Sequence, residues 1–215
     1  MSARDRILER VRRSAGRAEE EGGAIAAWAE ATRRQPVPQQ GSAHGPARLS
    51  QFIAKAEAAA ATVSRVSAMS ELPRALAHEL RNRNLGASIR MGEDPVLAGL
   101  DWGAIEVSRG PGRIEEPATL SRAEFGMAET GTLVLASGPS NPVTLTFLGE
   151  THFVVLPERD LVAGFEDLWS AWRGRGLDPR TINMVTGPSR SADIGQVLQL
   201  GAHGPIALHV LLVAE

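Results

Sequence analysis

Four short runs of largely apolar residues in the second half of the chain constrain its fold more than any other feature. Such runs, without polar alternation, predict strands that are buried on both faces. They lie at Leu133–Leu135, Phe153–Leu156, Ile182–Val185 and Leu208–Val213. Between the second and third runs, the apolar residues of segment 160–172 fall on one face of a helix. Strands that alternate with helices predict an α/β fold with a largely parallel sheet whose faces are both covered.

The preceding part of the chain shows the same alternation from Ala47 onward. Residues 49–60 carry apolar side chains at helical spacing. A further helix has Ser70 as its expected N-cap, Pro73 in its first turn, and an apolar stripe of leucines. The stripe consists of Leu72, Leu76 and Leu80. Strands are predicted at Thr62–Val66, Ala87–Met91 and Ile105–Val107.

The first 45 residues have a different character. Ser2-x-x-Asp5 resembles a capping box at the start of a helix. A second, alanine-rich helix is predicted at about 20–34, and residues 35–46 form a linker rich in proline and glycine. We therefore expect a helical arm and linker over residues 1–45, and an α/β domain over residues 46–215.

Composition excludes several kinds of chemistry. The chain has no cysteine, so it contains no disulfide, no thiolate nucleophile and no cysteine-held iron–sulfur cluster. Lys55 is the only lysine, and no Gly-Lys-Ser/Thr string of a phosphate-binding loop occurs. The five histidines lack the spacing of metal ligands, so no metal site is expected. A net charge of -2 gives no indication of nucleic-acid binding.

Location is predicted from two absences. The basic N-terminal stretch is not followed by an unbroken apolar segment, as a signal peptide would be. No apolar run approaches the ~20 residues that a membrane-spanning helix requires. We therefore expect a cytoplasmic protein.

The string Thr186–Ile194 is the most informative candidate site, because it directly follows a predicted strand. Open α/β sheets bind ligands outside the carboxyl ends of their strands. Gly187 allows the backbone to turn, and Ser189 and Ser191 supply hydroxyls beside an expected helix start. Arg190 is suited to hold a carboxylate or a phosphate through two hydrogen bonds.

A structural interpretation of the same string remains open. In it Ser191 is the N-cap of a helix that starts at about Ala192, and Asp193 interacts with the helix dipole. Arg190 then forms only a surface ion pair. Spacing alone does not separate this interpretation from ligand binding.

A second candidate is Glu129-Thr130-Gly131-Thr132, which separates two apolar stretches. Gly131 is expected to form a turn or bulge between them. Glu129 is a candidate acid, base or nucleophile, with Thr130 and Thr132 as hydrogen-bond donors. The alternative is a solvated carboxylate at a turn.

A third candidate is Gly201–Pro205, directly before the last predicted strand. His203 between small residues, followed by Gly204, can approach a ligand closely and titrates near neutral pH. The alternative is a polar turn residue that satisfies nearby backbone groups. His209 alternates with apolar neighbours, which favours a histidine packed within the strand.

These three motifs in series, from about Glu124 to the C-terminus, resemble the lactate utilization protein C (LUD domain) family. The resemblance implies a Rossmann-like, open and mostly parallel sheet flanked by helices, as in the sugar-isomerase and CoA-transferase superfamily. It also implies a role in oxidising L-lactate to pyruvate beside partner proteins that carry iron–sulfur clusters. The absence of cysteine agrees with that division of labour.

The resemblance implies a pocket formed by Glu129, Thr130, Ser189, Arg190, Asp193 and His203. The chain departs from the family at Ser140–Val143, where Asn141-Pro142 stands in place of an arginine-containing segment. The expected role is an accessory subunit that binds a small organic anion or partner proteins. Two alternatives remain: a stand-alone enzyme acting on a sugar phosphate, a CoA thioester or a folate, and a scaffold whose motifs serve only packing.

Overall fold

The computed structural model describes residues 2–15, 38–114, 116–192, 198–200 and 204–214, and the chain divides into two units, 1–38 and 39–215. The first unit contains helix α1 (Ala3–Ala15). Its predicted capping box is confirmed: the backbone N–H of Asp5 donates to Ser2 Oγ at 3.2 Å, and that of Ser2 donates to Asp5 Oδ2 at 2.9 Å. The helix predicted at about 20–34 lies outside the described residues.

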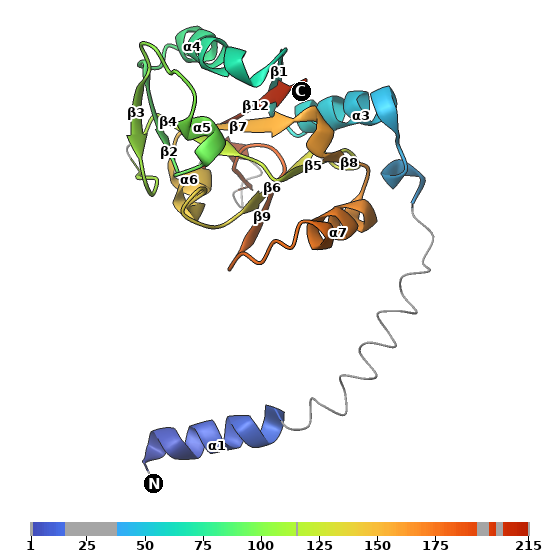
Figure 1. Ribbon diagram of the computed structural model, residues 1–215, viewed down its shortest axis with the longest axis vertical. Coiled ribbons are helices and arrows are strands. Elements are labelled where there is room, and N and C mark those ends of the chain that lie inside the picture. The colour runs from blue at the N-terminus through green and yellow to red at the C-terminus, as the bar shows by residue number, and fades with distance from the viewer. Residues whose placement is uncertain (1, 16–37, 115, 193–197, 201–203, 215) are drawn as a thin grey trace. The chain divides into compact units, whose positions relative to one another are not determined.

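The second unit is built on a six-stranded sheet in which all neighbouring strands are parallel (Figure 1). In spatial order its strands are β1 (Thr62–Val66), β12 (Ala207–Val213), β7 (Thr151–Pro157), β4 (Ala118–Arg122), β2 (Ser88–Met91) and β3 (Glu106–Arg109). The predicted parallel sheet is therefore confirmed. Strand β4 was not predicted, because Thr119 and Ser121 are polar residues whose burial depends on partners elsewhere in the chain.

Helices cover both faces of this sheet. Successive side chains of a strand point to opposite faces. Phe153 and Val155 of β7 accordingly pack in one apolar cluster with Leu76 of helix α4. Val154 lies in another cluster with Phe52 of helix α3. The helices are α3 (Gly45–Ala58), α4 (Leu72–Asn82), α5 (Pro95–Ala98), α6 (Val143–Leu148) and α7 (Phe165–Gly174), with short 3-10 turns η1 (Gln39–Gly41), η2 (Met69–Glu71) and η3 (Glu158–Asp160).

Two details of the predicted helices are corrected. Ser70 is not an N-cap, because it lies within η2 and the N-cap position of α4 belongs to Glu71, which makes no capping hydrogen bond through its side chain. The helix expected over 160–172 begins only at Phe165. Its expected first residues form η3 and the short strand β8, because Gly164 before the helix is extended. Within the described residues, no helix has the length and apolar character to cross a membrane.

A second sheet, which the sequence did not separate from the first, has four strands. They are β8 (Leu161–Val162), β5 (Phe125–Met127), β6 (Thr132–Ala136) and β9 (Ile182–Val185), in that order. Strands β5, β6 and β9 are antiparallel neighbours. Leu168 and Trp172 of α7 pack on this sheet with Phe125 and Val134. Two of the predicted buried strands, β6 and β9, therefore belong to this sheet.

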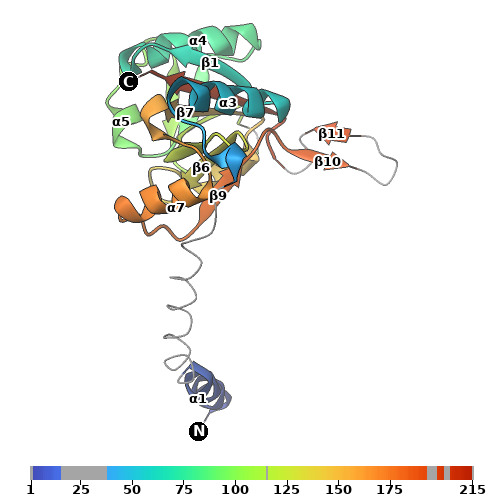
Figure 2. The same ribbon diagram turned by 90° about the vertical axis from the view of Figure 1, so that its right-hand side faces the viewer.

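A two-stranded hairpin extends from the second unit beyond the strand β9 (Figure 2). It consists of β10 (Arg190–Ala192) and β11 (Leu198–Leu200), which pair antiparallel, with Ala192 opposite Leu198. The helix expected to start at about Ala192 is therefore wrong. A strand was missed here because its pairing partner lies beyond residue 197 and carries no marker of a hairpin in the sequence.

Candidate functional site

A cavity of about 310 Å³ lies where strands β7 and β12 begin and strand β9 ends. Its lining comes from α6, from the first residues of β7 and β12, and from the segments on either side of the β10–β11 hairpin. The lining residues are Thr146, Phe147, His152, Met184, Val185, Thr186, Gly187, Pro188, Ser189, Arg190, Gly204, Pro205 and Leu208. Two of the three sequence motifs, around Arg190 and Gly204, thus meet at one cavity.

Backbone hydrogen bonds hold these segments together. The N–H of Ser189 donates to the carbonyl of Pro205 at 2.9 Å, and the N–H of Ile206 donates to that of Glu150 at 2.8 Å. His152 and Leu208 face each other in the register of β7 and β12. The cavity therefore lies at the amino ends of these parallel strands. Our expectation of a site at the carboxyl ends of strands holds only for β9, which ends at Val185 beside the cavity.

His152 is the polar group that the sequence did not single out. It is fully buried, and its Nε2 lies 3.0 Å from Ser121 Oγ of the neighbouring strand β4. Its Nδ1 has no hydrogen-bond partner among the described residues. Burial lowers the pKa of His152 to about 3, so the ring is neutral at ordinary pH. A histidine within an apolar strand is the only sequence signal that marks this position.

Thr146 supplies a second unpaired polar atom on the same cavity. Its side chain is buried, and its Oγ1 has no partner among the described residues. A buried polar group without a partner costs about 1–3 kcal/mol. His152 and Thr146 therefore each carry one buried polar atom that has no partner among the residues the structure describes.

The rim of the cavity is both charged and apolar. Arg190 is exposed and has no ion-pair partner among the described residues, so the surface ion pair of the structural interpretation is not found there. Phe147 and Met184 line the cavity with 41% and 38% of their surface exposed. A guanidinium beside exposed apolar side chains suits an anion that carries a short carbon chain.

The glycines of two motifs have a packing role against helix α3. Gly131 and Gly187 both adopt positive φ, +71° and +76°. A Cβ at Gly131 would lie 2.3 Å from the backbone nitrogen of Ala56, and one at Gly187 would lie 2.0 Å from the carbonyl oxygen of Ala59. Both positions therefore require glycine, both for the turn and for the approach of the helix.

The Glu129–Thr132 turn lies beside the cavity without entering it. Three hydroxyls form a chain in which Thr132 Oγ1 is 2.6 Å from Thr130 Oγ1 and 2.6 Å from Thr186 Oγ1. Of these residues only Thr186 lines the cavity. The carboxylate of Glu129 lies against Gly164 and Gly41 instead. The turn joins β5 to β6, as expected for Gly131, but the candidate acid is not part of the cavity lining.

The structure does not describe all of the predicted site residues. Asp193 and His203 are outside the described residues, and only the backbone of Ser191, in β10, is described. Asn141, which we expected to stand in place of an arginine-containing segment of the family, is buried in a turn where its backbone pairs with Gly138. This turn leads into α6 and so determines where Thr146 lies.

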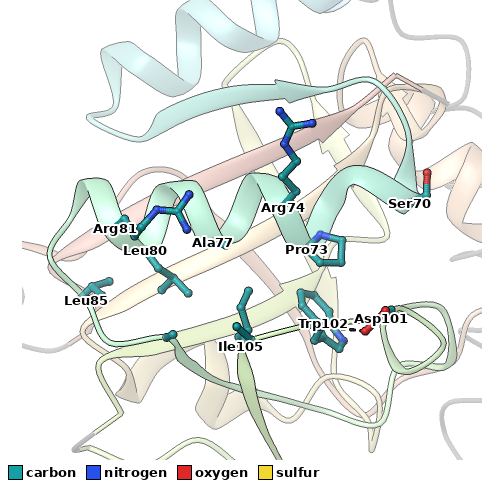
Figure 3. Close-up of a pocket in the computed structure, with 13 residues that line it drawn as sticks. Ser70, Pro73, Arg74, Ala77, Leu80, Arg81, Leu85, Asp101, Trp102 and Ile105 are labelled. Atoms are coloured by element: carbon teal, nitrogen blue, oxygen red, sulfur yellow. Dashed lines mark hydrogen bonds between the residues drawn. The ribbon is translucent and has the colours of Figure 1, made fainter.

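A larger cavity, of about 420 Å³, lies between α4 and the segment before β3 (Figure 3). Leu80 of the helix and Trp102 and Ile105 of the segment are among its lining residues. Two of its polar groups are paired: Trp102 Nε1 donates to the Leu97 carbonyl at 3.0 Å, and Asp101 Oδ1 accepts from the N–H of Gly103 at 3.0 Å. None of the unpaired buried atoms in the described residues belongs to its lining. The smaller cavity is therefore the better candidate.

Metal binding has no support in the described part of the chain. No group of three or more His, Asp or Glu side chains is arranged there to hold an ion.

Residues 117–213 match the family model described as LUD domain. The chain is 30% identical over 150 residues to lactate utilization protein C of Anoxybacillus flavithermus, which covers 66% of this chain and 64% of that protein. It is 36% identical over 100 residues to an uncharacterized protein of Neisseria meningitidis serogroup B, which covers 45% of this chain and 42% of that protein. The chain thus spans less than two thirds of the length of these relatives.

A solved structure has the same fold. It is a DUF162 family protein of Deinococcus radiodurans, with a TM-score of 0.58 and 22% sequence identity, and the match covers 78% of this chain and 96% of that one. Every residue that lines the cavity beside Arg190 falls within the range that matches the family model. Residues 117–213 of the chain are therefore similar to the LUD domain.

Proposed function

We propose that this chain is an accessory subunit of a system that oxidises L-lactate to pyruvate, in which it binds a small organic anion. The observation that carries the proposal is the cavity beside Arg190, a residue without an ion-pair partner in the described part of the chain; His152 and Thr146 also line this cavity. The relatives named lactate utilization protein C support the choice of pathway.

The partners follow from the chemistry of the reaction. Oxidising a secondary alcohol to a ketone releases electrons, which need an acceptor. This chain has no cysteine to hold an iron–sulfur cluster. In the proposal the clusters are therefore carried by partner proteins, and this chain contributes binding and orientation of the acid.

Deleting the gene in its native host tests the pathway. We expect the deletion strain to lose growth on L-lactate as sole carbon source and to grow normally on pyruvate, which bypasses the oxidation. A plasmid with the wild-type gene restores growth, and one with Arg190→Ala restores it poorly. Normal growth of the deletion strain on L-lactate would overturn the proposal.

The partner proposal has a separate test. The tagged chain, purified from cells growing on L-lactate, is expected to bring down iron–sulfur proteins in fixed proportion. Recovery of the chain alone, from cells in which the lactate phenotype is intact, contradicts an accessory role in a stable complex.

The alternative of a stand-alone isomerase or transferase has less support. Its candidate acid or nucleophile, Glu129, does not line the cavity. A thermal-shift series with sugar phosphates and CoA esters tests it, since a ligand present at 100 times its Kd adds about 2.7 kcal/mol to stability.

A further inference from the structure

The larger cavity is a groove that runs along helix α4, opposite the segment that precedes β3 (Figure 3). Its volume is about 420 Å³. One wall follows the chain from Ser70, just before the helix, to Arg81 near its end, a length of roughly 16 Å at ~1.5 Å per residue. The other wall is the segment 101–105. The groove is therefore elongated along the helix.

The groove presents apolar surface. Its most deeply buried lining residues, Leu80 and Ile105, belong to one apolar cluster. Ala77, Leu85 and Trp102 pack against this cluster but are only partly buried, so each keeps accessible surface. Because the Nε1 of the tryptophan already donates to a backbone carbonyl, its ring offers the groove apolar surface rather than a donor. Such a surface suits the apolar face of another molecule.

Two arginines lie on the α4 wall of this groove, as Figure 3 shows. Arg74 and Arg81 are exposed, and neither has an ion-pair partner among the described residues. They are seven residues apart, which places them on the same side of the helix and about 10 Å apart along its axis. Ala77 lies between them on the same wall.

The carboxylates near the groove do not neutralise these two charges. Asp101 is the one acidic residue in the lining, and it lies on the opposite wall, where its Oδ1 accepts from the N–H of Gly103 at 3.0 Å. Glu79 of α4 does not line the groove, and its Oε2 lies 3.9 Å from Arg83 Nε. A partner that brings carboxylates to the α4 wall is therefore electrostatically complementary to the groove.

The walls favour a helical partner over an extended one. The α4 wall is a helix, whose backbone groups bond within it. In the other wall the N–H of Ile105 donates to the carbonyl of Trp102 at 3.0 Å, and the N–H of Glu106 donates to that of Ala87 at 2.8 Å. Neither wall is a free strand edge, so a peptide does not bind here by adding a strand. An amphipathic helix that places side chains in the groove fits instead.

We propose that the groove between α4 and segment 101–105 binds an acidic amphipathic helix of a partner protein. Two carboxylates about two turns apart bind Arg74 and Arg81, and the apolar residues between them cover Ala77 and Trp102. The inference goes beyond the proposed function and does not depend on the lactate pathway.

Two labelled synthetic helical peptides serve as probes. In one, two glutamates seven residues apart flank a pair of leucines; in the other, lysines replace both glutamates. We expect the purified full-length chain, in fluorescence anisotropy titrations, to bind the glutamate peptide at least tenfold more tightly than the lysine peptide. Equal affinities, or no binding of the glutamate peptide at millimolar concentration, contradict the inference.

Charge reversal separates recognition from folding. Both side chains changed in Arg74→Glu/Arg81→Glu are exposed, so we expect this double variant to fold and to bind the lysine peptide more tightly than the glutamate peptide. Arg173→Glu/Arg180→Glu is the matched control, since it makes the same change in net charge at two exposed arginines outside the groove. An equal change of preference in both double variants means that net charge alone is responsible, and it refutes the assignment.

A bulky side chain at Ala77 tests the apolar part of the groove and the identity of the occupant. We expect folded Ala77→Trp to bind the glutamate peptide at least tenfold more weakly than the wild type; an unchanged affinity places the peptide elsewhere. Sedimentation equilibrium without peptide is expected to give the same mass for both proteins. A wild-type dimer that Ala77→Trp dissociates means that a second copy of the chain occupies the groove, against the proposal.

Discussion

Two buried histidines in adjacent strands of the same sheet have different surroundings. His209 of β12 is paired at both ring nitrogens: Nδ1 lies 2.7 Å from Thr62 Oγ1, and Nε2 lies 2.9 Å from Ser64 Oγ. Arg83 of α4 adds a contact to Nδ1 at 3.2 Å. Within the described ranges of the chain, His152 of β7 is paired at Nε2 alone, and this residue lines the cavity.

The difference shows where this fold has capacity left for a ligand. Burial lowers the pKa of both rings, that of His209 to about 4 and that of His152 to about 3, so both are neutral near pH 7. The nearby charge of Arg83 further lowers the pKa of His209. The pairing separates them: both ring nitrogens of His209 have partners, whereas Nδ1 of His152 has none in the part of the chain that the structure describes.

Acidification is expected to have the largest effect on the free energy of unfolding, and it acts through both buried histidines, His152 and His209. The unfolded chain takes up protons at its histidines below pH 6.5, whereas the folded chain resists until about pH 4 at His209 and about pH 3 at His152. Stability is therefore complete above pH 6.5 and falls as pH decreases. With about 1.4 kcal/mol per pH unit for each histidine, the loss between pH 6.5 and 5.0 is about 3 kcal/mol.

Urea unfolding at several pH values within that range measures this loss, before most carboxylates titrate. A free energy of unfolding that stays constant between pH 6.5 and 5.0 contradicts the burial of both rings in neutral form.

Replacement of His209, whose ring is paired at both nitrogens, is expected to have the next largest effect on the free energy of unfolding. His209→Ala removes the ring partner of the Ser64 hydroxyl and opens a void beside Phe153, whose ring centroid is 5.7 Å from that of the imidazole. We expect a loss of about 2–3 kcal/mol in the free energy of unfolding and about half the pH dependence.

The smallest expected change in the free energy of unfolding separates two buried threonines that differ in hydrogen bonding, Thr119 and Thr146. Thr119→Val removes a hydroxyl that donates to a buried carbonyl, and we expect it to cost about 1 kcal/mol. Thr146→Val removes an unpaired hydroxyl, so its cost is expected to stay below about 0.5 kcal/mol, or stability rises. Chemical denaturation of the ligand-free variants compares them; equal losses mean that the Thr146 hydroxyl has a partner in the folded protein.

Local patterns predicted much of the fold. The apolar runs of β7 and β12 and the leucine stripe of α4 are visible in the sequence, because one side-chain period dominates each of them. Strand β4 and the β10–β11 hairpin were missed. The polar residues of β4 are buried only through contacts with β7 and α6, and β10 depends on a partner strand further along the chain.

The candidate site was predicted in part. The motif around Arg190 and the glycine at Gly204 were identified from turn chemistry and from the resemblance to a family. His152 and Thr146 were not, since neither belongs to a motif. Glu129 was given a role that its position away from the cavity does not support.

The sequence by itself determined that this chain forms a parallel sheet covered by helices, because burial of apolar side chains at regular spacing is a local property. It also determined that the chain holds no cysteine-bound cluster. Only the tertiary structure decided that His152, Thr146 and Arg190 line one cavity. Strand pairing and helix packing bring these residues together over separations that no local pattern records.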